Sequence, residues 1–219
     1  MSKKEIVIYG CGGHGRVIHD ILLNMKDVHV VGFVDDNQQM SGSIINGSEV
    51  IGTSSVLKQL ITDGVGAMAL GIGNNHVRGK LYVKWQEAGF TMINVVHPGT
   101  IVSKNVRFGR GVVIMPGVVI NTGSEIGDNT CINTGATIDH DNKLGDHVNI
   151  GPGATLTGGV AVGNYTDICA NVTINPYLSV GFKTVVGSGT VVVSNIPDNV
   201  TVVGVPARIV SNTSREEVL

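Results

Sequence analysis

An aliphatic residue recurs at every sixth position through most of the second half of the chain, and this period restricts the possible folds most. The series contains only aliphatic residues and one phenylalanine: Val102, Phe108, Ile114, Ile120, Ile126, Ile132, Ile138, Leu144, Ile150, Leu156, Val162, Ile168, Ile174, Val180, Val186 and Val192. Most members are followed four residues later by a small or β-branched residue, which suits a tight corner. A second period of eighteen residues is superimposed, in Gly109, Gly127, Gly145, Gly163 and Gly181. Three hexapeptides therefore make one coil.

Each hexapeptide predicts a short strand followed by a corner, and coils of this kind are stable only when stacked, because one coil cannot bury its own apolar face. A sandwich of ordinary strands is the alternative, but it does not require so long a regular series. Composition agrees, since 42% of the residues are hydrophobic, only 4% are aromatic and 31 are glycines. The core must then consist of small aliphatic side chains. The sequence predicts an all-β parallel β-helix.

The first part of the chain has a different pattern, that of an α/β domain. Residues 5–9 read as a buried strand, residues 10–15 as a glycine-rich loop and residues 16–25 as an amphipathic helix. A second strand over residues 29–34 ends at Asp35-Asp36. Glycines allow backbone N–H groups to approach a phosphate, and an acidic residue at the end of the second strand can bind a ribose. This arrangement suits a nucleotide diphosphate.

The rest of this domain continues the alternation of helices and strands. We expect a helix capped by Thr53-Ser54, a strand over 67–72, a helix opened by residues 71–75 and a strand over 91–95. These boundaries give a nucleotide-sugar-binding α/β domain at 1–97, a β-helix at 98–210 and a polar C-terminal tail at 211–219. The α/β domain has about half the strands of a full dinucleotide fold, which favours a nucleotide carried by the substrate. NAD binding and a glycine-rich turn without a ligand are the alternatives.

Asp139-His140-Asp141 stands out in a part of the repeat that has few charges. His140 comes two residues after the core position Ile138, so we expect its ring at the outer surface of the coil. An imidazole can accept a proton at neutral pH, and a neighbouring carboxylate can orient it and raise its basicity. The pair suits deprotonation of an amine or hydroxyl that attacks a thioester. A solvated polar turn is the alternative.

Metal and cysteine chemistry are not expected. No His-x3-His or Cys-x2-Cys spacing occurs, so the sequence predicts no metal site. The three cysteines, Cys11, Cys131 and Cys169, show no disulfide framework, and we predict that none is a nucleophile.

Charge and hydropathy patterns exclude other partners and locations. The net charge is -2, so the chain lacks the basic surface that nucleic acid or an anionic membrane would need. No apolar run approaches the roughly 18–20 residues that span a bilayer. The basic start at residues 1–4 leads directly into a strand pattern, without the apolar stretch of a signal peptide. We expect a cytoplasmic protein with small-molecule ligands.

Five motifs together narrow the class of protein: Tyr9-Gly10-Cys11-Gly12-Gly13-His14-Gly15, Asp35-Asp36, Gly71-Ile72-Gly73-Asn74-Asn75, Thr137-Ile138-Asp139-His140-Asp141 and Gly204-Val205-Pro206-Ala207. In this combination, which covers about residues 4–210, the chain resembles the bacterial sugar O- and N-acetyltransferases of the left-handed β-helix (hexapeptide-repeat) superfamily. That group includes the acetyltransferases of the bacillosamine and perosamine pathways and the sialic acid O-acetyltransferases. A left-handed coil follows from the resemblance alone, because crossovers are usually right-handed.

The resemblance also implies site residues. It implies that His140 is the general base and that Asp141 raises its basicity. The implied nucleotide-sugar contacts are Gly12, Gly13, His14, Asp35, Asp36 and Gly73. The implied acetyl-CoA contacts are Asn149, Ala170 and Ser188, in a groove between adjacent β-helices of a homotrimer. The bacillosamine enzyme has a histidine where Asn149 stands and a glutamate where Asp141 stands.

We therefore expect an acetyl-CoA-dependent N-acetyltransferase. Its acceptor would be the 4-amino group of a nucleotide-linked 4-amino-4,6-dideoxy sugar used in surface glycan biosynthesis. We expect UDP as the nucleotide. The alternatives are a GDP-perosamine N-acetyltransferase, an O-acetyltransferase of sialic acid or a related sugar, and a non-catalytic nucleotide-sugar-binding scaffold. Val113, Met115 and Val119 occupy positions that the repeat directs outward, and an exposed apolar stripe there would support a trimer.

Overall fold

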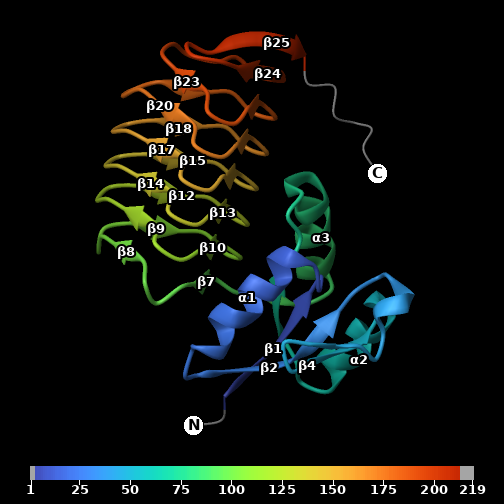
Figure 1. The fold of residues 1–219 in the computed structure, drawn as a ribbon. Helices are drawn as coiled ribbons and strands as arrows, with labels where there is room; N and C mark the ends of the chain where they lie inside the picture. The colour runs from blue at the N-terminus through green and yellow to red at the C-terminus, as the bar shows by residue number, and fades with distance from the viewer. Residues whose placement is uncertain (1–2, 213–219) are drawn as a thin grey trace. The chain divides into compact units, whose positions relative to one another are not determined.

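The computed structural model describes residues 3–212, and the chain divides into two compact units. The first unit ends at Pro98 and the second begins at Gly99. The first is an α/β unit and the second is a parallel β-helix, and both can be followed by colour in Figure 1. Within the described residues, no helix has both the length and the apolar character needed to cross a membrane.

The α/β unit is built on a six-stranded sheet with the order β3-β4-β2-β1-β5-β6. The strands are β1 (Lys4–Tyr9), β2 (Val28–Val34), β3 (Ile44–Ile45), β4 (Ser48–Gly52), β5 (Ala67–Leu70) and β6 (Thr91–Met92). All neighbours are parallel except β3 and β4, which form an antiparallel hairpin that the sequence pattern did not reveal. The order reverses between β1 and β5, and ligands bind parallel sheets at such a switch point.

Three helices and two short 3-10 helices connect these strands: α1 (Gly13–Leu23), α2 (Leu57–Thr62), α3 (Asn75–Glu87), η1 (Gln38–Met40) and η2 (Ser54–Val56). Helix α1 starts inside the glycine-rich loop, three residues before the expected start at Arg16. The expected helix after Thr53 is divided between η2 and α2. The strand expected over 91–95 is likewise divided, between β6 and β7 (Val95–Val96).

The core of the α/β unit is apolar, as the buried strands predict. One cluster joins side chains of β1 and β5, such as Val7 and Met68, to Tyr82 and Trp85 of α3. Phe90 stacks edge-on against Trp85, with ring centroids 6.2 Å apart. This packing anchors the carboxyl ends of β1 and β5, where the glycine-rich loops begin.

The second unit consists of coils whose short strands, most of them two residues long, stack in parallel into three sheets. One sheet contains β10 (Val113–Ile114), β13 (Cys131–Ile132), β16 (Asn149–Ile150), β19 (Asp167–Ile168), β22 (Val185–Val186) and β24 (Val200–Val203). A second contains β8 (Ile101–Val102), β11 (Val119–Ile120), β14 (Thr137–Ile138), β17 (Thr155–Leu156), β20 (Thr173–Ile174) and β23 (Val191–Val192). The third contains β9 (Arg107–Phe108), β12 (Glu125–Ile126), β15 (Lys143–Leu144), β18 (Ala161–Val162) and β21 (Ser179–Val180).

The six-residue series lies where the sequence placed it, as the second residue of each of these short strands. Paired residues are eighteen apart, as in Ile120↔Ile138 and Ile138↔Leu156, so each coil adds one strand to every sheet. Every member of the series is buried except Val102 and Phe108, which are half-buried. Those two belong to the terminal strands β8 and β9, which have a neighbour on only one side in their sheets.

Two sequence expectations about this unit need correction. Val113 and Met115 are buried and Val119 is half-buried, so they form no exposed apolar stripe. The polar tail expected from Ser211 also starts too early, because β25 (Arg208–Asn212) pairs antiparallel with β24. The remaining residues of the expected tail, 213–219, lie outside the described residues.

Candidate active site

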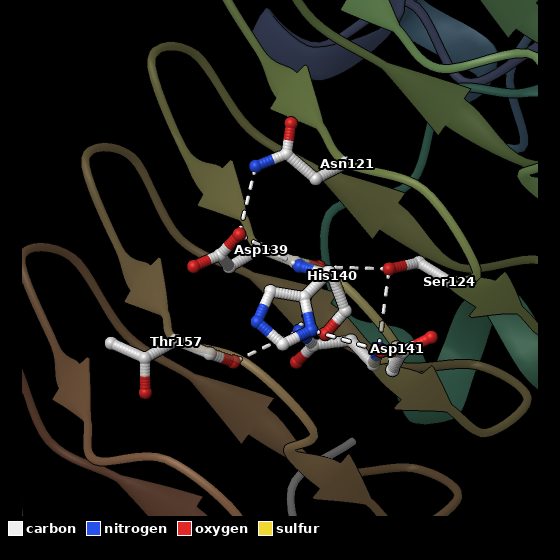
Figure 2. Close-up of polar contacts among 7 residues, drawn as sticks. Asn121, Ser124, Asp139, His140, Asp141 and Thr157 are labelled. Atoms are coloured by element: carbon white, nitrogen blue, oxygen red, sulfur yellow. Dashed lines mark hydrogen bonds and ion pairs between the residues drawn. The ribbon is translucent and has the colours of Figure 1, made fainter.

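His140 and Asp141 form a hydrogen-bonded pair at the corner that follows β14 (Figure 2). The Nδ1 atom of His140 lies 2.9 Å from Oδ2 of Asp141, and both side chains are well exposed, at 45% and 69%. The backbone of Asp141 is left-handed, with φ at 58°, which turns its side chain back towards the preceding residue. The pair therefore lies on the outer surface of the coil, as the position of Ile138 predicts.

The neighbouring acid and the charge pattern both favour a basic imidazole. The hydrogen bond to Asp141 raises the pKa of His140, and the charges of Asp139 and Asp141 add to this effect, although desolvation opposes it. Asp139 has a different task, because Oδ1 accepts hydrogen bonds from the Asn121 amide and from the His140 backbone N–H, both at 2.8 Å. These two hydrogen bonds lower the pKa of Asp139. Asp141, and not Asp139, is the carboxylate that contacts the ring.

Gly158, one coil further on, provides the space in which the imidazole lies. A Cβ atom added to Gly158 would lie 2.5 Å from Nε2 and 2.6 Å from Cε1 of His140. On the other side of the pair, a Cβ atom at Gly123 would lie 2.2 Å from Oδ1 of Asp141. One glycine from the preceding coil and one from the following coil thus border the His140–Asp141 pair.

In the α/β unit, Asp35 and Asp36 lie just beyond the carboxyl end of β2. Asp35 accepts hydrogen bonds from the backbone N–H groups of Cys11 and Asn37, each at 3.0 Å. Asp36 accepts from the Tyr9 hydroxyl and from the backbone N–H of Ser54, the latter at 2.8 Å. Burial opposes ionisation of both acids, but these hydrogen bonds outweigh it and lower the pKa of each. Both acids are therefore ionised, and they organise the loops around them.

The glycines of the two loops divide into two groups. Gly10, Gly15 and Gly71 pack backbone against backbone, since a Cβ atom on Gly15 would lie 1.9 Å from the Gly10 carbonyl oxygen. Gly12, Gly13 and Gly73 have open space where a Cβ atom would stand, and all three are exposed. The first group closes the turn between strand and helix. The second leaves backbone accessible to a ligand, as expected for the implied nucleotide contacts.

His14 lies at the start of α1 and is half-buried. Burial, followed by the charge of Arg78, lowers the pKa of His14 to about 4. Arg78 is buried in α3, and Nη1 donates to the carbonyl oxygens of Ile72 and Gly73, both at 3.1 Å. His14 is therefore neutral near pH 7 and can act as a hydrogen-bonding group, not as a cation.

The expected acetyl-CoA contacts lie on another part of the coil from His140. Asn149 is half-buried in β16, and Ala170 and Ser188 occupy equivalent corners of successive coils, where Gly189 N–H donates to the Ala170 carbonyl at 2.9 Å. That corner follows the sheet of β16 and β19, whereas His140 follows β14 in the second sheet. Within one chain, the structure does not bring the two sets together at one corner.

Among residues 3–212, no group of three or more His, Cys, Asp or Glu side chains is arranged to hold a metal ion. All three cysteines are free thiols. Cys11 is buried, and burial together with a hydrogen bond to Asp35 raises the pKa of its thiol to about 11. Such a thiol is almost entirely protonated at neutral pH and is a poor nucleophile.

Two residues of this site were missed by the sequence reasoning. Gly158 had a weak signal, because single glycines are common at corners of the repeat. Asn142 had a clearer signal, since it interrupts the corner positions that hold Val106, Ser124 and Val160 in other coils. Its side chain is completely buried at the His140–Asp141 corner.

A hexapeptide β-helix that carries an exposed histidine–carboxylate pair, on a chain that also has a nucleotide-type α/β fold, defines a class of acyltransferases. Comparison with known families agrees. Residues 5–85 match the PglD N-terminal domain, and residues 105–140 match the bacterial transferase hexapeptide (six repeats).

Known proteins narrow the class further. PerB from Caulobacter crescentus, solved in complex with CoA and GDP-perosamine, is 39% identical with a TM-score of 0.89, covering 94% of this chain and 96% of that chain. The acetyltransferase domain of PglB from Neisseria gonorrhoeae FA1090, solved with acetyl coenzyme A, is 31% identical with a TM-score of 0.88, covering 95% and 100%. UDP-N-acetylbacillosamine N-acetyltransferase from Bacillus subtilis (strain 168) is 35% identical over 112 residues, and this chain covers only 51% of its length.

These similarities over nearly the whole chain identify the family. The chain belongs to the left-handed β-helix, hexapeptide-repeat N-acetyltransferases of nucleotide-linked amino sugars. It is thereby an enzyme of the acyltransferase class.

Proposed function

We propose that this protein transfers the acetyl group of acetyl-CoA to the 4-amino group of a nucleotide-linked 4-amino-4,6-dideoxy sugar, in the biosynthesis of a surface glycan. The observation that carries the proposal is the exposed His140–Asp141 pair on a β-helix of this family. Relatives solved with CoA, acetyl-CoA or GDP-perosamine support the substrate classes.

His140 acts as the general base in this proposal. The sugar amine attacks the thioester carbonyl carbon, and Nε2 of His140 takes the proton that the nitrogen loses. The tetrahedral intermediate collapses, the C–S bond breaks, and the proton passes from His140 to the CoA thiolate. The products are the N-acetylated sugar and CoA, so neither a covalent acyl-enzyme nor a metal takes part.

Asp141 keeps the imidazole in the required form. Its carboxylate binds Nδ1 at 2.9 Å, which places the proton of neutral His140 on Nδ1 and the basic lone pair on Nε2. Nε2 lies close to Gly158, because a Cβ atom at that residue would come within 2.5 Å of it, so glycine is needed there for the ring to hold this position.

The α/β unit binds the nucleotide in this proposal. Gly12, Gly13 and Gly73 offer open backbone at the switch point of the sheet, and α1 begins there with N–H groups that favour a phosphate. Asp35 and Asp36 are ionised and hold these loops, while neutral His14 offers a hydrogen bond to the sugar.

The proposed acetyl-CoA site requires a second chain, and we propose a homotrimer. Within one chain, His140 follows the second sheet, whereas Asn149, Ala170 and Ser188 lie in or just after strands of the first sheet, in successive coils. A groove between two parallel β-helices would bring one corner of each chain together, and closed cyclic symmetry provides such contacts.

The test is release of CoA thiol from acetyl-CoA with UDP- and GDP-linked 4-amino sugars and free sialic acid as acceptors. We expect turnover only with a nucleotide-linked amino sugar and a loss of roughly 10²–10⁴-fold in kcat for His140→Ala. The active nucleotide then distinguishes a UDP-linked from a GDP-linked acceptor. Turnover with sialic acid alone, or full activity of the variant, would contradict the proposal.

A further inference from the structure

We propose that Asn142 is a positioning residue that holds His140 at the working distance from the next coil. The proposal rests on the proposed function of His140 as the base. Asn142 is fully buried, and its amide nitrogen donates to the Asp139 carbonyl at the His140–Asp141 corner. The amide is unusual at this position of the repeat, because the equivalent corners one coil before and one coil after hold Ser124 and Val160.

The amide nitrogen of Asn142 joins two successive coils at the site. Nδ2 lies 2.8 Å from the carbonyl oxygen of Asp139 and 2.9 Å from that of Thr157, with a longer contact of 3.3 Å to the carbonyl oxygen of His140. Asp139 directly precedes His140, and Thr157 directly precedes Gly158. The Asn142 amide therefore holds the backbone next to His140 and also the backbone next to Gly158, against which the His140 imidazole lies.

The oxygen atom of the same amide is placed unfavourably. Oδ1 of Asn142 is buried and has no hydrogen-bond partner among the described residues. An unsatisfied buried polar atom is unfavourable for folding, and valine fills the same corner one coil later, at Val160. The fold alone therefore does not require an amide at this corner, and the contacts that Nδ2 makes beside His140 are the reason we assign it a role at the site.

The hydroxyl groups of Ser124 and Thr166 show which hydrogen bonds buried side chains make at corners of the β-helix in general. Its hydroxyl donates to the carbonyl of Asp139 at 2.8 Å and accepts from the Asn142 backbone N–H at 3.2 Å. Thr166 repeats the pattern away from the site, donating to the Gly181 carbonyl at 2.6 Å and accepting from the Thr184 N–H at 3.2 Å. Hydroxyls in this geometry thus stabilise corners in general, and the Asn142 contact with Thr157 spans the same fifteen residues. Asn142 also donates to the Asp139 and His140 carbonyls of its own corner.

The test compares Asn142→Val with Asn142→Thr. Threonine has the same shape as valine but keeps one hydrogen-bond donor. For Asn142→Val we expect kcat to fall about 10–100-fold, as for other misplaced catalytic groups, while KM for both substrates changes less than about threefold. The thermal unfolding midpoint should change little, because removal of the unsatisfied amide oxygen offsets the loss of the Nδ2 hydrogen bonds. Asn142→Thr should recover part of kcat. Thr166→Val is the matched control and should lower the midpoint with kcat unchanged.

An NMR titration of the His140 ring keeps this test separate from the proposed function. If Asn142 positions the pair, Asn142→Val weakens the contact with Asp141 and the His140 titration moves to lower pH, whatever the role of His140 in catalysis. Full activity of His140→Ala would refute the proposed base but leave this shift measurable. An unchanged titration, or a kcat for Asn142→Val within twofold of wild type, would overturn the positioning role.

Discussion

Replacing Gly158 by alanine should displace the His140 ring, the proposed base, without unfolding the protein. The added Cβ atom would lie 2.5 Å from Nε2 of His140, whereas ordinary van der Waals contact starts at 3.4 Å. The imidazole must therefore retreat by about 1 Å, and a misplacement of this size costs on the order of 10²-fold in rate. The backbone at Gly158 does not need a left-handed conformation, so alanine adds no backbone strain.

The assay is steady-state thiol release at saturating acetyl-CoA and acceptor, together with thermal unfolding. We expect kcat to fall about 10²-fold while the unfolding midpoint changes little, because the exposed ring can rotate towards solvent. Gly66→Ala is the matched control, since a Cβ atom there meets nothing within 4 Å. If Gly158→Ala retained kcat within twofold of wild type, the position of Nε2 beside Gly158 could not be the one used in catalysis.

Two further predictions concern the ionisation of the base and the glycine-rich loop. The hydrogen bond to Asp141 raises the pKa of His140, so the activity of the wild type should rise as pH rises through that raised pKa. In Asp141→Asn the acid limb of the kcat profile should move to lower pH, and the plateau value of kcat should fall. A profile with an unmoved acid limb would exclude Asp141 as the group that tunes the base. Gly15→Ala should destabilise the fold by about 1–3 kcal/mol or more, because its Cβ atom would overlap the Gly10 carbonyl oxygen. Gly12→Ala should leave stability unchanged and raise KM for the nucleotide sugar. Calorimetry measures the stability of both variants, and steady-state kinetics measures KM.

The β-helix was predictable from sequence because its core depends on one repeated position. Ile120, Ile138 and Leu156 are buried and paired eighteen residues apart, as the period requires. His140 followed from the same register, since its offset from Ile138 places it on the outer surface. The local pattern carried this information because each coil repeats the same short-range geometry.

Other features depend on contacts that the repeat does not encode. Val113 and Met115 occupy outward positions of the lattice yet are buried, because burial depends on the surrounding chain as well as on strand alternation. The hairpin of β3 and β4 is formed by short strands that give little periodic signal. Asn142 was visible only as an interruption, and its purpose required the positions of the Asp139 and Thr157 carbonyls.

The stacked coils also set distances along the axis of the β-helix in fixed steps. Paired strands in a sheet are about 4.8 Å apart, and each step here takes eighteen residues, as between Thr137 and Thr155. His140 and Ser188 are therefore separated along the axis by a number of steps that the chain length alone determines. Insertion of one complete coil between them would leave both corners unchanged but lengthen that separation by about 4.8 Å. Coil number thus sets the axial distance between any two corners without changing either corner.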